Sequence, residues 1–371
     1  KLNHSGLFDE ALFVLIGDQW KRHRKLLQPA FAPSHLKHTA KVTIETMAKL
    51  FNILDHQLKT TGQLQVNMHH IMTTCALEII GKVAFGESLG VVDKLSTEES
   101  TRFITPRWLW RFLGVSNHTY KIKTAKLNVM TYFQSIATKR SIQIANNAHP
   151  QDHEMDILYR LLLAKQKGLM TQDEIMGEIV GFFLAGHETT ANTITSCIYD
   201  LCMNPEIMES VYKSVSDVDE SDINHLLDQL TKLRYLDNVL KESQRLRPVI
   251  TQLTRISNRT VDVLGHQFPS NTIFILNLYA IQLDGRYYDK PMEFKPDRFD
   301  EQLEVGAFMP FGDGQHNCIG QKMAMIELKI MLVMMIKRYR ISLVEGLPVE
   351  FEMSMTRGLK KGLIVNLEKR D

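Results

Sequence analysis

The sequence has no long hydrophobic run and no paired set of cysteines. No stretch of its 371 residues approaches the roughly 18 consecutive apolar residues that a membrane-spanning helix needs. Its four cysteines are Cys75, Cys197, Cys202 and Cys318, and none of them forms a C-x-x-C motif. We therefore expect no transmembrane helix within these residues and no disulfide scaffold. We also expect the protein to work in a reducing environment.

An excess of charge of one sign is also missing. The 44 Lys and Arg residues nearly balance the 42 Asp and Glu residues, which leaves a formal net charge of +2. Such a balance gives no general attraction to nucleic acid, so we expect no nucleic-acid partner. There is no tandem repeat, low-complexity tract or linker, and we expect residues 1–371 to form a single domain. The chain opens at Lys1 close to a motif, which suggests a fragment.

The hydrophobic pattern predicts a mainly α protein with a small β portion. Helical spacing runs through residues 35–90, through about 116–146, from about Thr171 to Met203, and from Ile319 to about Lys337. Residues 249–280 and the last 30 residues alternate as short strands do. His69 and His70 are adjacent, hence on different helix faces, and we interpret them as hydrogen-bonded histidines rather than a metal pair.

A glycine-rich loop around Cys318 is the most informative stretch. Phe311 lies seven residues before Cys318, Gly314 lies four before it, and Gly320 lies two after it. Because a helix is predicted to follow, Cys318 should lie at a helix N-terminus, where free N–H groups favour a thiolate. The glycines let the loop bend and let its backbone approach whatever the sulfur binds.

The long predicted helix from about Thr171 carries a polar motif at its centre. Thr171 and Glu174 form a capping box, and Asn204-Pro205 ends the helix. The central Ala185-Gly186-His187-Glu188-Thr189-Thr190 places a carboxylate and hydroxyls in mid-helix, and Thr189 can bond the carbonyl of Ala185. Small residues there would let a flat ligand lie against the backbone. The alternative is a polar cluster on a kinked core helix.

Two helical pairs have ordinary interpretations by themselves. Trp20 and Arg24 are four residues apart and share a helix face, as in a basic surface helix with one anchoring Trp. Glu242 and Arg245 are i,i+3 neighbours, as in a solvated ion pair.

Together these motifs resemble those of the cytochrome P450 family. The spacing F-x-x-G-x-[basic]-x-C-x-G at 311–320 resembles its heme-ligating loop, which implies that Cys318 is the proximal ligand of the iron of heme b. Trp20 and Arg24 resemble its W-x-x-x-R helix, and Arg255 stands where the family often places another heme-propionate ligand. The implied cofactor-binding residues are Trp20, Arg24, Arg255, Phe311, Gly314, His316, Cys318 and Gly320.

The same resemblance assigns roles to the other motifs. Ala185–Thr190 resembles the family's [AG]-G-x-[DE]-T-T motif, which implies that Thr189 positions dioxygen and that Glu188 relays protons. Glu242 and Arg245 resemble the E-x-x-R helix, and Arg298 of Pro296-Asp297-Arg298-Phe299 should join them in a structural triad. Two positions depart from the pattern: His316 stands where most members have Arg, and Gln315 where many have Pro.

The resemblance implies a heme-thiolate monooxygenase that uses O2, with the cytochrome P450 fold. Its eukaryotic microsomal style implies NADPH-cytochrome P450 reductase as electron donor, and location on the cytoplasmic face of the endoplasmic reticulum membrane. The membrane anchor and the first helix and strands would belong to a missing N-terminal segment, and without it we expect poor heme binding. The alternatives are a non-catalytic heme-binding remnant and a heme-thiolate isomerase or dehydratase.

The substrate is implied to be a lipophilic small molecule, but core packing explains the candidate lining residues equally well. Those candidates are Phe182, Phe183, Ile250–Leu253, Met355 and Thr356. The Pro-led aromatic cluster Thr105–Trp110 is explained by ordinary packing between helices. The resemblance implies a second interpretation, because in membrane-bound members similar apolar residues lie on a surface that dips into the bilayer.

Overall fold

The computed structural model describes residues 10–96, 119–145 and 156–370. The helices are α1 Gly17–Leu27, η1 Gln28–Phe31, α2 Pro33–Thr61, α3 Met68–Phe85, η2 Asp93–Ser96, α6 Thr119–Ala145, α7 Ile157–Gln166, α8 Gln172–Met203, α9 Pro205–Val215, α10 Ile223–Lys232, α11 Arg234–Leu246, α12 Leu278–Gln282, η4 Pro296–Asp300 and α13 Gln321–Arg338. The strands are β1 Leu64–Asn67, β2 Gln252–Ile256, β3 Val261–Val263, β4 His266–Phe268, β5 Ile273–Asn277, β6 Tyr339–Leu343, β7 Phe351–Met353, β8 Arg357–Leu359 and β9 Ile364–Lys369.

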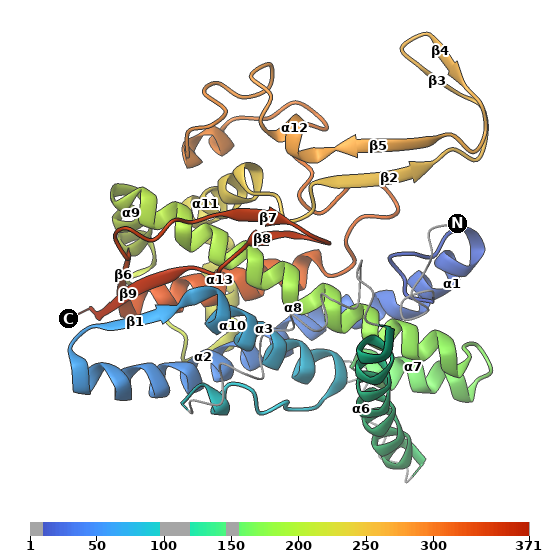
Figure 1. Cartoon of the computed structure of the whole chain (residues 1–371), viewed down its shortest axis with the longest axis horizontal. Coiled ribbons are helices and arrows are strands. Elements are labelled where there is room, and N and C mark those ends of the chain that lie inside the picture. Colours follow the sequence, from blue (N-terminus) through green and yellow to red (C-terminus); the bar gives the residue numbers. More distant parts are fainter. Residues whose placement is uncertain (1–9, 97–118, 146–155, 371) are drawn as a thin grey trace.

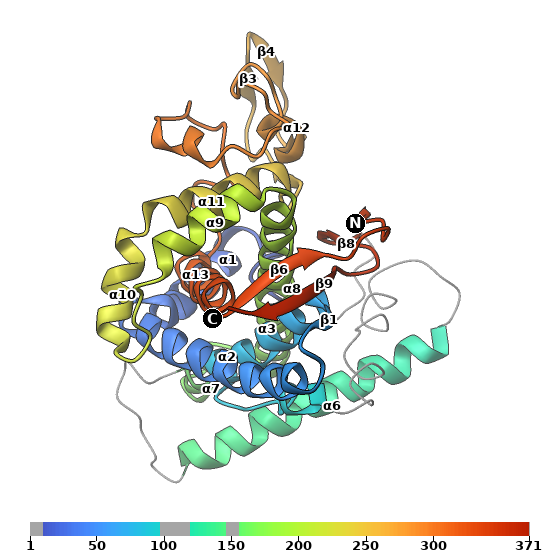
Figure 2. The ribbon, with the colours of Figure 1, turned by 90° about the vertical axis from the view of Figure 1, so that its left-hand side faces the viewer.

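The described residues form a helical body with small antiparallel sheets, which confirms the predicted mainly α class with a small β portion. Helix α8 runs through the middle of the body, with α3 on one side and α13 on another (Figures 1 and 2). The β2–β5 ribbon, the β3–β4 hairpin and α12 stand above this body in both views. None of the described helices is long and apolar enough to span a bilayer.

Helix α8 has the length and the cap that the sequence predicts. It spans 32 residues, and the Thr171 hydroxyl accepts a hydrogen bond from the Glu174 N–H while the Glu174 carboxylate accepts one from the Thr171 N–H. The side chains of α8 are buried along most of its length because α3, α7, α11 and α13 all pack against it. A helix enclosed in this way can carry polar residues only where partners are provided.

One strand was not predicted. Residues 35–90 read as continuous helix, yet β1 interrupts them and pairs antiparallel with β9, with Leu64 opposite Leu367 and Asn67 opposite Ile364. β9 also pairs with β6, which gives the order β1-β9-β6. The strand partner is about 300 residues away in the sequence, so no local pattern near Leu64 indicates it.

The predicted ion triad is confirmed and completely buried at its centre. Glu242 and Arg245 are both 0% exposed and pair through two hydrogen bonds, of 2.7 and 2.8 Å. Arg298 donates to the same carboxylate at 3.0 Å. Arg245 also donates to the backbone carbonyls of Gln282, Pro291 and Glu293. The triad therefore ties α11 to η4 and to the segment that leads into it.

Two expectations lie outside the described residues: the aromatic cluster Thr105–Trp110 and the polar loop at 147–154. The predicted absence of disulfides is confirmed, since all four cysteines are free.

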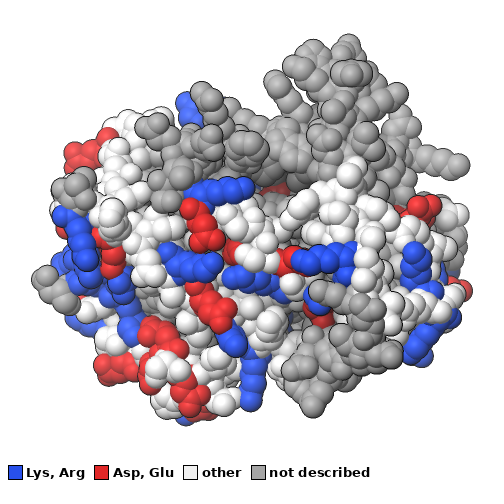
Figure 3. Space-filling view, turned by 90° about the horizontal axis from the view of Figure 1, so that it is seen from below, with Lys and Arg blue, Asp and Glu red and all other residues white. Residues whose placement is uncertain are grey.

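On the face seen in Figure 3, Lys and Arg side chains lie beside Asp and Glu side chains.

We expect Glu242→Gln to lower the free energy of unfolding by about 3 kcal/mol, because it leaves the buried Arg245 guanidinium without its counter-charge. Denaturant unfolding followed by circular dichroism measures this change. Lys232→Gln is the matched control, because it breaks a helical pair with Asp228 whose side chains are 70% and 58% exposed, and it should lower the stability far less than Glu242→Gln does. Equal effects of the two substitutions would contradict a structural role for the triad.

Glu327 of α13 should make stability depend on pH. Burial raises the pKa of its carboxyl from 4.5 to about 8, and its Oε1 has no hydrogen-bond partner among the described residues. Between these two pH values the unfolded chain ionises Glu327 while the folded chain keeps it protonated, so stability falls as pH rises from 4.5 to about 8.

Glu327→Gln should remove this loss, because the amide cannot ionise. We expect the variant to gain on the order of a few kcal/mol over the parent at pH 8, and the gain to shrink toward pH 5. Unfolding free energies measured at both pH values test this. Glu45→Gln, at an exposed site on α2, should show no such trend. A gain for Glu327→Gln that does not vary with pH would contradict the interpretation.

Candidate functional site

The loop before α13 is closed by its own backbone. The Cys318 N–H donates to the Phe311 carbonyl at 2.8 Å, and the Asn317 N–H donates to the Gly314 carbonyl at 3.2 Å. Gly312 and Gly314 have φ values of 71° and 72°, a region that favours glycine. These bonds hold the backbone of Cys318 in place just before α13, whose N-cap is Gly320. Gly320 itself has an ordinary φ of −88°.

Cys318 is the exposed member of the four cysteines. The others are buried or half-buried, and burial raises the pKa of the Cys75 and Cys202 thiols to about 12. Protein atoms around the Cys318 sulfur also raise its pKa, although the Gly320 N–H and the Arg24 charge lower it. The expected thiolate is therefore not favoured by the protein alone, because desolvation outweighs the helix N-terminus. Metal ligation itself removes a thiol proton.

Helix α1 brings two of the predicted residues to this loop. The Arg24 guanidinium donates to the Asn317 backbone carbonyl and to its side-chain oxygen, each at 2.9 Å. Trp20 is 8% exposed, and its ring stacks on the His316 imidazole, with centroids 3.8 Å apart and planes inclined by 24°. The structure thus brings Trp20, Arg24, His316 and Cys318 together.

Arg255 lies on β2, and its charge acts on the same loop. The charges of Arg255 and Arg24, together with burial as the largest cause, lower the pKa of His316. Within the described ranges, neither Arg24 nor Arg255 forms an ion pair with a carboxylate. Two guanidiniums without carboxylate partners, acting on a glycine-rich loop with an exposed cysteine, suit an anionic ligand that holds a metal.

Helix α1 also corrects an expectation about its basic residues. The sequence pattern was interpreted as a basic surface helix, but Arg22 donates to the Leu169 carbonyl and pairs with the Glu174 carboxylate. Next to it, the buried His23 ring bonds Glu178 at 2.7 Å. These contacts anchor α1 to the first turns of α8. Lys21 and Lys25 remain exposed.

The motif in the middle of α8 has two differently oriented sides. Ala185 is exposed, and the Thr189 hydroxyl donates to the Ala185 carbonyl at 2.6 Å, as expected. Gly186 instead packs against α3, where an added Cβ would come within 2.6 Å of the Ile80 side chain. Of the two small residues, only Ala185 therefore faces the open side of the helix.

Glu188 points away from that open side. It is 7% exposed, and its carboxylate accepts a hydrogen bond from the Thr356 hydroxyl, in the turn between β7 and β8. Burial raises the pKa of Glu188 to about 7, and the Thr356 hydrogen bond opposes this rise. A carboxyl group with a pKa near neutrality can both accept and release a proton under physiological conditions.

Sequence reasoning missed four residues of this region: Asn317, which Arg24 binds, and Thr356, Asn192 and His69, which lie around Glu188. Thr356 was considered only as a substrate contact. Contacts over 168 positions, as between Glu188 and Thr356, leave no local signal. The expectation of two hydrogen-bonded histidines holds for His69, but the Nε2 of His70 is buried without a partner among the described residues.

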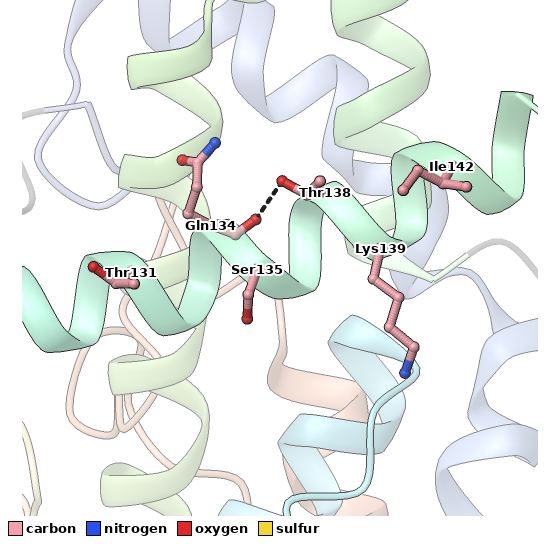
Figure 4. Close-up of a pocket in the computed structure, with 6 residues that line it drawn as sticks. All are labelled: Thr131, Gln134, Ser135, Thr138, Lys139 and Ile142. Carbon is pink, nitrogen blue, oxygen red and sulfur yellow. Dashed lines mark hydrogen bonds between the residues drawn. The ribbon is translucent and has the colours of Figure 1, made fainter.

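A separate hollow of about 630 Å³ lies along α6 (Figure 4). Its lining residues, all from that one helix, are Thr131, Gln134, Ser135, Thr138, Lys139 and Ile142. It includes neither the Cys318 loop nor the central motif of α8. We therefore assign it no part in the site.

Comparison with known proteins identifies the family. The family model described as Cytochrome P450 matches residues 3–364. The chain is 26% identical to Cytochrome P450 3A40 of Oryzias latipes, over 95% of this chain and 74% of that protein. It is 25% identical to Cytochrome P450 3A7 of Homo sapiens, over 99% of this chain and 77% of that protein. It is 29% identical to Cytochrome P450 6d1 of Musca domestica, over 97% of this chain and 78% of that protein.

The family model thus spans nearly the whole chain, including the Cys318 loop, the central motif of α8 and the buried triad. The family's members bind heme b and are monooxygenases. The chain belongs to the cytochrome P450 family, and it is an oxidoreductase of that heme-dependent class.

Proposed function

We propose that this enzyme hydroxylates a hydrophobic organic substrate, with Cys318 as the thiolate ligand of the heme iron. One atom of O2 enters a C–H bond of the substrate and the other leaves as water, with two electrons and two protons consumed. The single observation that carries the site assignment is the exposed Cys318 beside Arg24, with Arg255 acting on His316 of the same loop; neither arginine has a carboxylate partner in the described structure.

The residues around the thiol fit heme b. Its two propionates require donors, and the indole of Trp20, the guanidiniums of Arg24 and Arg255 and the imidazole of His316 supply them. Arg24 uses one N–H on each terminal nitrogen for Asn317, which leaves further N–H groups for a propionate. Phe311, Gly314 and Gly320 would shape the loop that carries Cys318. This is the basis for proposing all eight as cofactor-binding residues.

Heme b, when bound, supplies the redox chemistry that splits dioxygen. The side chains of this protein would deliver the protons that the reaction consumes. We propose that the partly exposed Thr189 hydroxyl orients a proton donor at the open side of α8, and that Glu188 exchanges protons with it. The pKa of Glu188, near 7, suits this exchange.

The sequence also left two other interpretations open. A non-catalytic heme-binding remnant would keep the Cys318 loop but would not need Glu188 and Thr189. A heme-thiolate isomerase or dehydratase would need no reductase and no proton delivery to dioxygen. The intact Glu188-Thr189 pair favours the monooxygenase over both.

The electron donor and location are proposed from the family's microsomal members. We infer that NADPH-cytochrome P450 reductase supplies electrons, and that the exposed Lys21 and Lys25 of α1 contribute to its docking surface. We also propose that the enzyme acts on the cytoplasmic face of the endoplasmic reticulum membrane. Lipophilic substrates would fit the partly exposed Phe182, whose ring lies 5.7 Å from that of Phe31.

Cys318→Ser should abolish the red-shifted Soret band that reduced enzyme shows under carbon monoxide, because a serine oxygen cannot act as a thiolate ligand. The absorbance spectrum of the purified protein measures this. Cys202→Ser, at a half-buried site bonded to the Ile341 carbonyl, is the control and should keep the band. A red-shifted band that survives Cys318→Ser would refute the ligand assignment.

Thr189→Ala should leave heme bound but divert turnover, because the hydroxyl orders protons without touching the cofactor. We expect peroxide formed per NADPH to rise several-fold and product per NADPH to fall. The matched control is Thr193→Ala, one turn along, where the hydroxyl donates to the Thr189 carbonyl at 2.7 Å. If both variants behave like the parent, Thr189 serves only the local geometry of α8.

A further inference from the structure

The Glu188 carboxylate is the end point of a chain of three hydrogen bonds, of which the two nearest to it are buried. The Thr356 hydroxyl binds its Oε1 atom. The Asn192 side-chain amide donates to the Thr356 oxygen at 3.1 Å, and the Nε2 of His69 lies 2.9 Å from the Asn192 side-chain oxygen. This series of hydrogen bonds leads from α3 through α8 to the turn between β7 and β8. These contacts join three separate parts of the sequence.

With Glu188 ionised, the three bonds all point the same way. A carboxylate only accepts hydrogen bonds, so the Thr356 hydroxyl must donate to it. The Thr356 oxygen can then accept from the Asn192 amide N–H. The Asn192 oxygen in turn accepts from a His69 ring protonated on Nε2. Every group in the chain is satisfied in this direction, and each bond reinforces the next.

The members of the chain are held firmly in place. Asn192 is 4% exposed, and it packs so closely on Gly358 that a Cβ there would come within 2.6 Å of its side-chain oxygen. The turn that carries Thr356 is closed by a hydrogen bond from the Ser354 N–H to the Thr356 carbonyl at 3.0 Å. Next to it, the Arg357 N–H donates to the Val249 carbonyl at 2.8 Å. The hydroxyl is therefore presented from a fixed backbone.

No opposite charge takes the place of this hydrogen bond. Burial and the Thr356 hydrogen bond are the causes that shift the pKa of Glu188 within the described structure, and no charged side chain is among them. Ionisable groups of the surrounding elements include His69 and His70 of α3, His187 of α8, Arg357 of β8 and Glu327 of α13. Burial lowers the pKa of all three histidines and raises that of Glu327, so these groups are neutral near pH 7. The Arg357 guanidinium lies over the rings of Tyr279 and Phe351. The Thr356 hydroxyl is thus the group that stabilises the Glu188 carboxylate.

We propose that Thr356, Asn192 and His69 are positioning residues, which hold Glu188 as a hydrogen-bonded carboxylate turned toward the β7–β8 turn and so govern when it gives up its proton. This inference rests on the proposed function, in which Glu188 exchanges protons with the open side of α8. None of the three residues is required to touch heme or substrate. Their effect on the reaction would be exerted through Glu188.

The test is an infrared titration of the oxidised holoenzyme without reductase. The C=O stretch of protonated Glu188 is identified by its loss in Glu188→Gln, and its intensity is followed against pH. We expect a midpoint near pH 7 in the parent. Thr356→Val should raise the midpoint by about one pH unit, because a hydrogen bond to the charged form is lost. Thr356→Ser keeps the hydroxyl and should restore the parent midpoint.

The more distant members are tested in the same way. Asn192→Leu should raise the midpoint less than Thr356→Val does, because the Thr356 hydroxyl remains but loses its support. Thr193→Ala, on the neighbouring position of α8, should leave the midpoint unchanged. A midpoint that does not move in Thr356→Val, in a variant that still binds heme, overturns the inference.

Product formed per NADPH is measured in parallel and separates the two proposals. A raised midpoint together with a pH profile of product yield displaced in the same direction supports both. A raised midpoint with an unchanged profile supports the positioning role of Thr356. In that case the role of Glu188 in proton exchange, and with it that part of the proposed function, fails.

Discussion

The contact on which the site depends is the pair of hydrogen bonds from Arg24 to Asn317. The two residues are 293 positions apart. The Arg24 guanidinium donates hydrogen bonds to both the backbone carbonyl and the side-chain oxygen of Asn317, the residue next to Cys318. This contact fixes α1 against the loop before α13, so Trp20 can stack on His316. α1 is in turn held on α8 by the bonds of Arg22 and His23 to Glu174 and Glu178. Through α1, these contacts connect the loop that carries Cys318 to α8, which carries the central motif.

Helix geometry explains how α8 serves two environments at once. Consecutive residues on a helix point about 100° apart, so Glu188 and Thr189 point in different directions. Thr189 stays near Ala185 on the open side, whereas Glu188 enters the interior and requires a partner there. The β7–β8 turn provides that partner in Thr356. Gly186 allows α3 to approach on another face, because a side chain there would collide with Ile80.

Much of the fold was predictable from the sequence because its signals are local. The capping box at Thr171 and the Asn204-Pro205 stop determine the ends of α8 through contacts within one helical turn. The ion triad was predicted from a resemblance, and the structure confirms that Arg298 joins Glu242 and Arg245. Strand β1 was missed because its stability comes from β9, far away in the chain. The docking of Arg22 was missed for the same reason: its partners Leu169 and Glu174 lie about 150 positions later.

The sequence by itself determined the chemistry that is available: one cysteine in a glycine-rich loop, two arginines and a tryptophan able to bind carboxylates, and an acid next to an alcohol in mid-helix. Residue types and short spacings specify this, because backbone geometry relates neighbours over one or two turns. Only the tertiary structure decided that Cys318 is exposed while its thiol pKa is raised, and that Glu188 turns inward to Thr356. Burial and hydrogen-bond partners set a pKa, and both depend on segments that come together only when the chain folds.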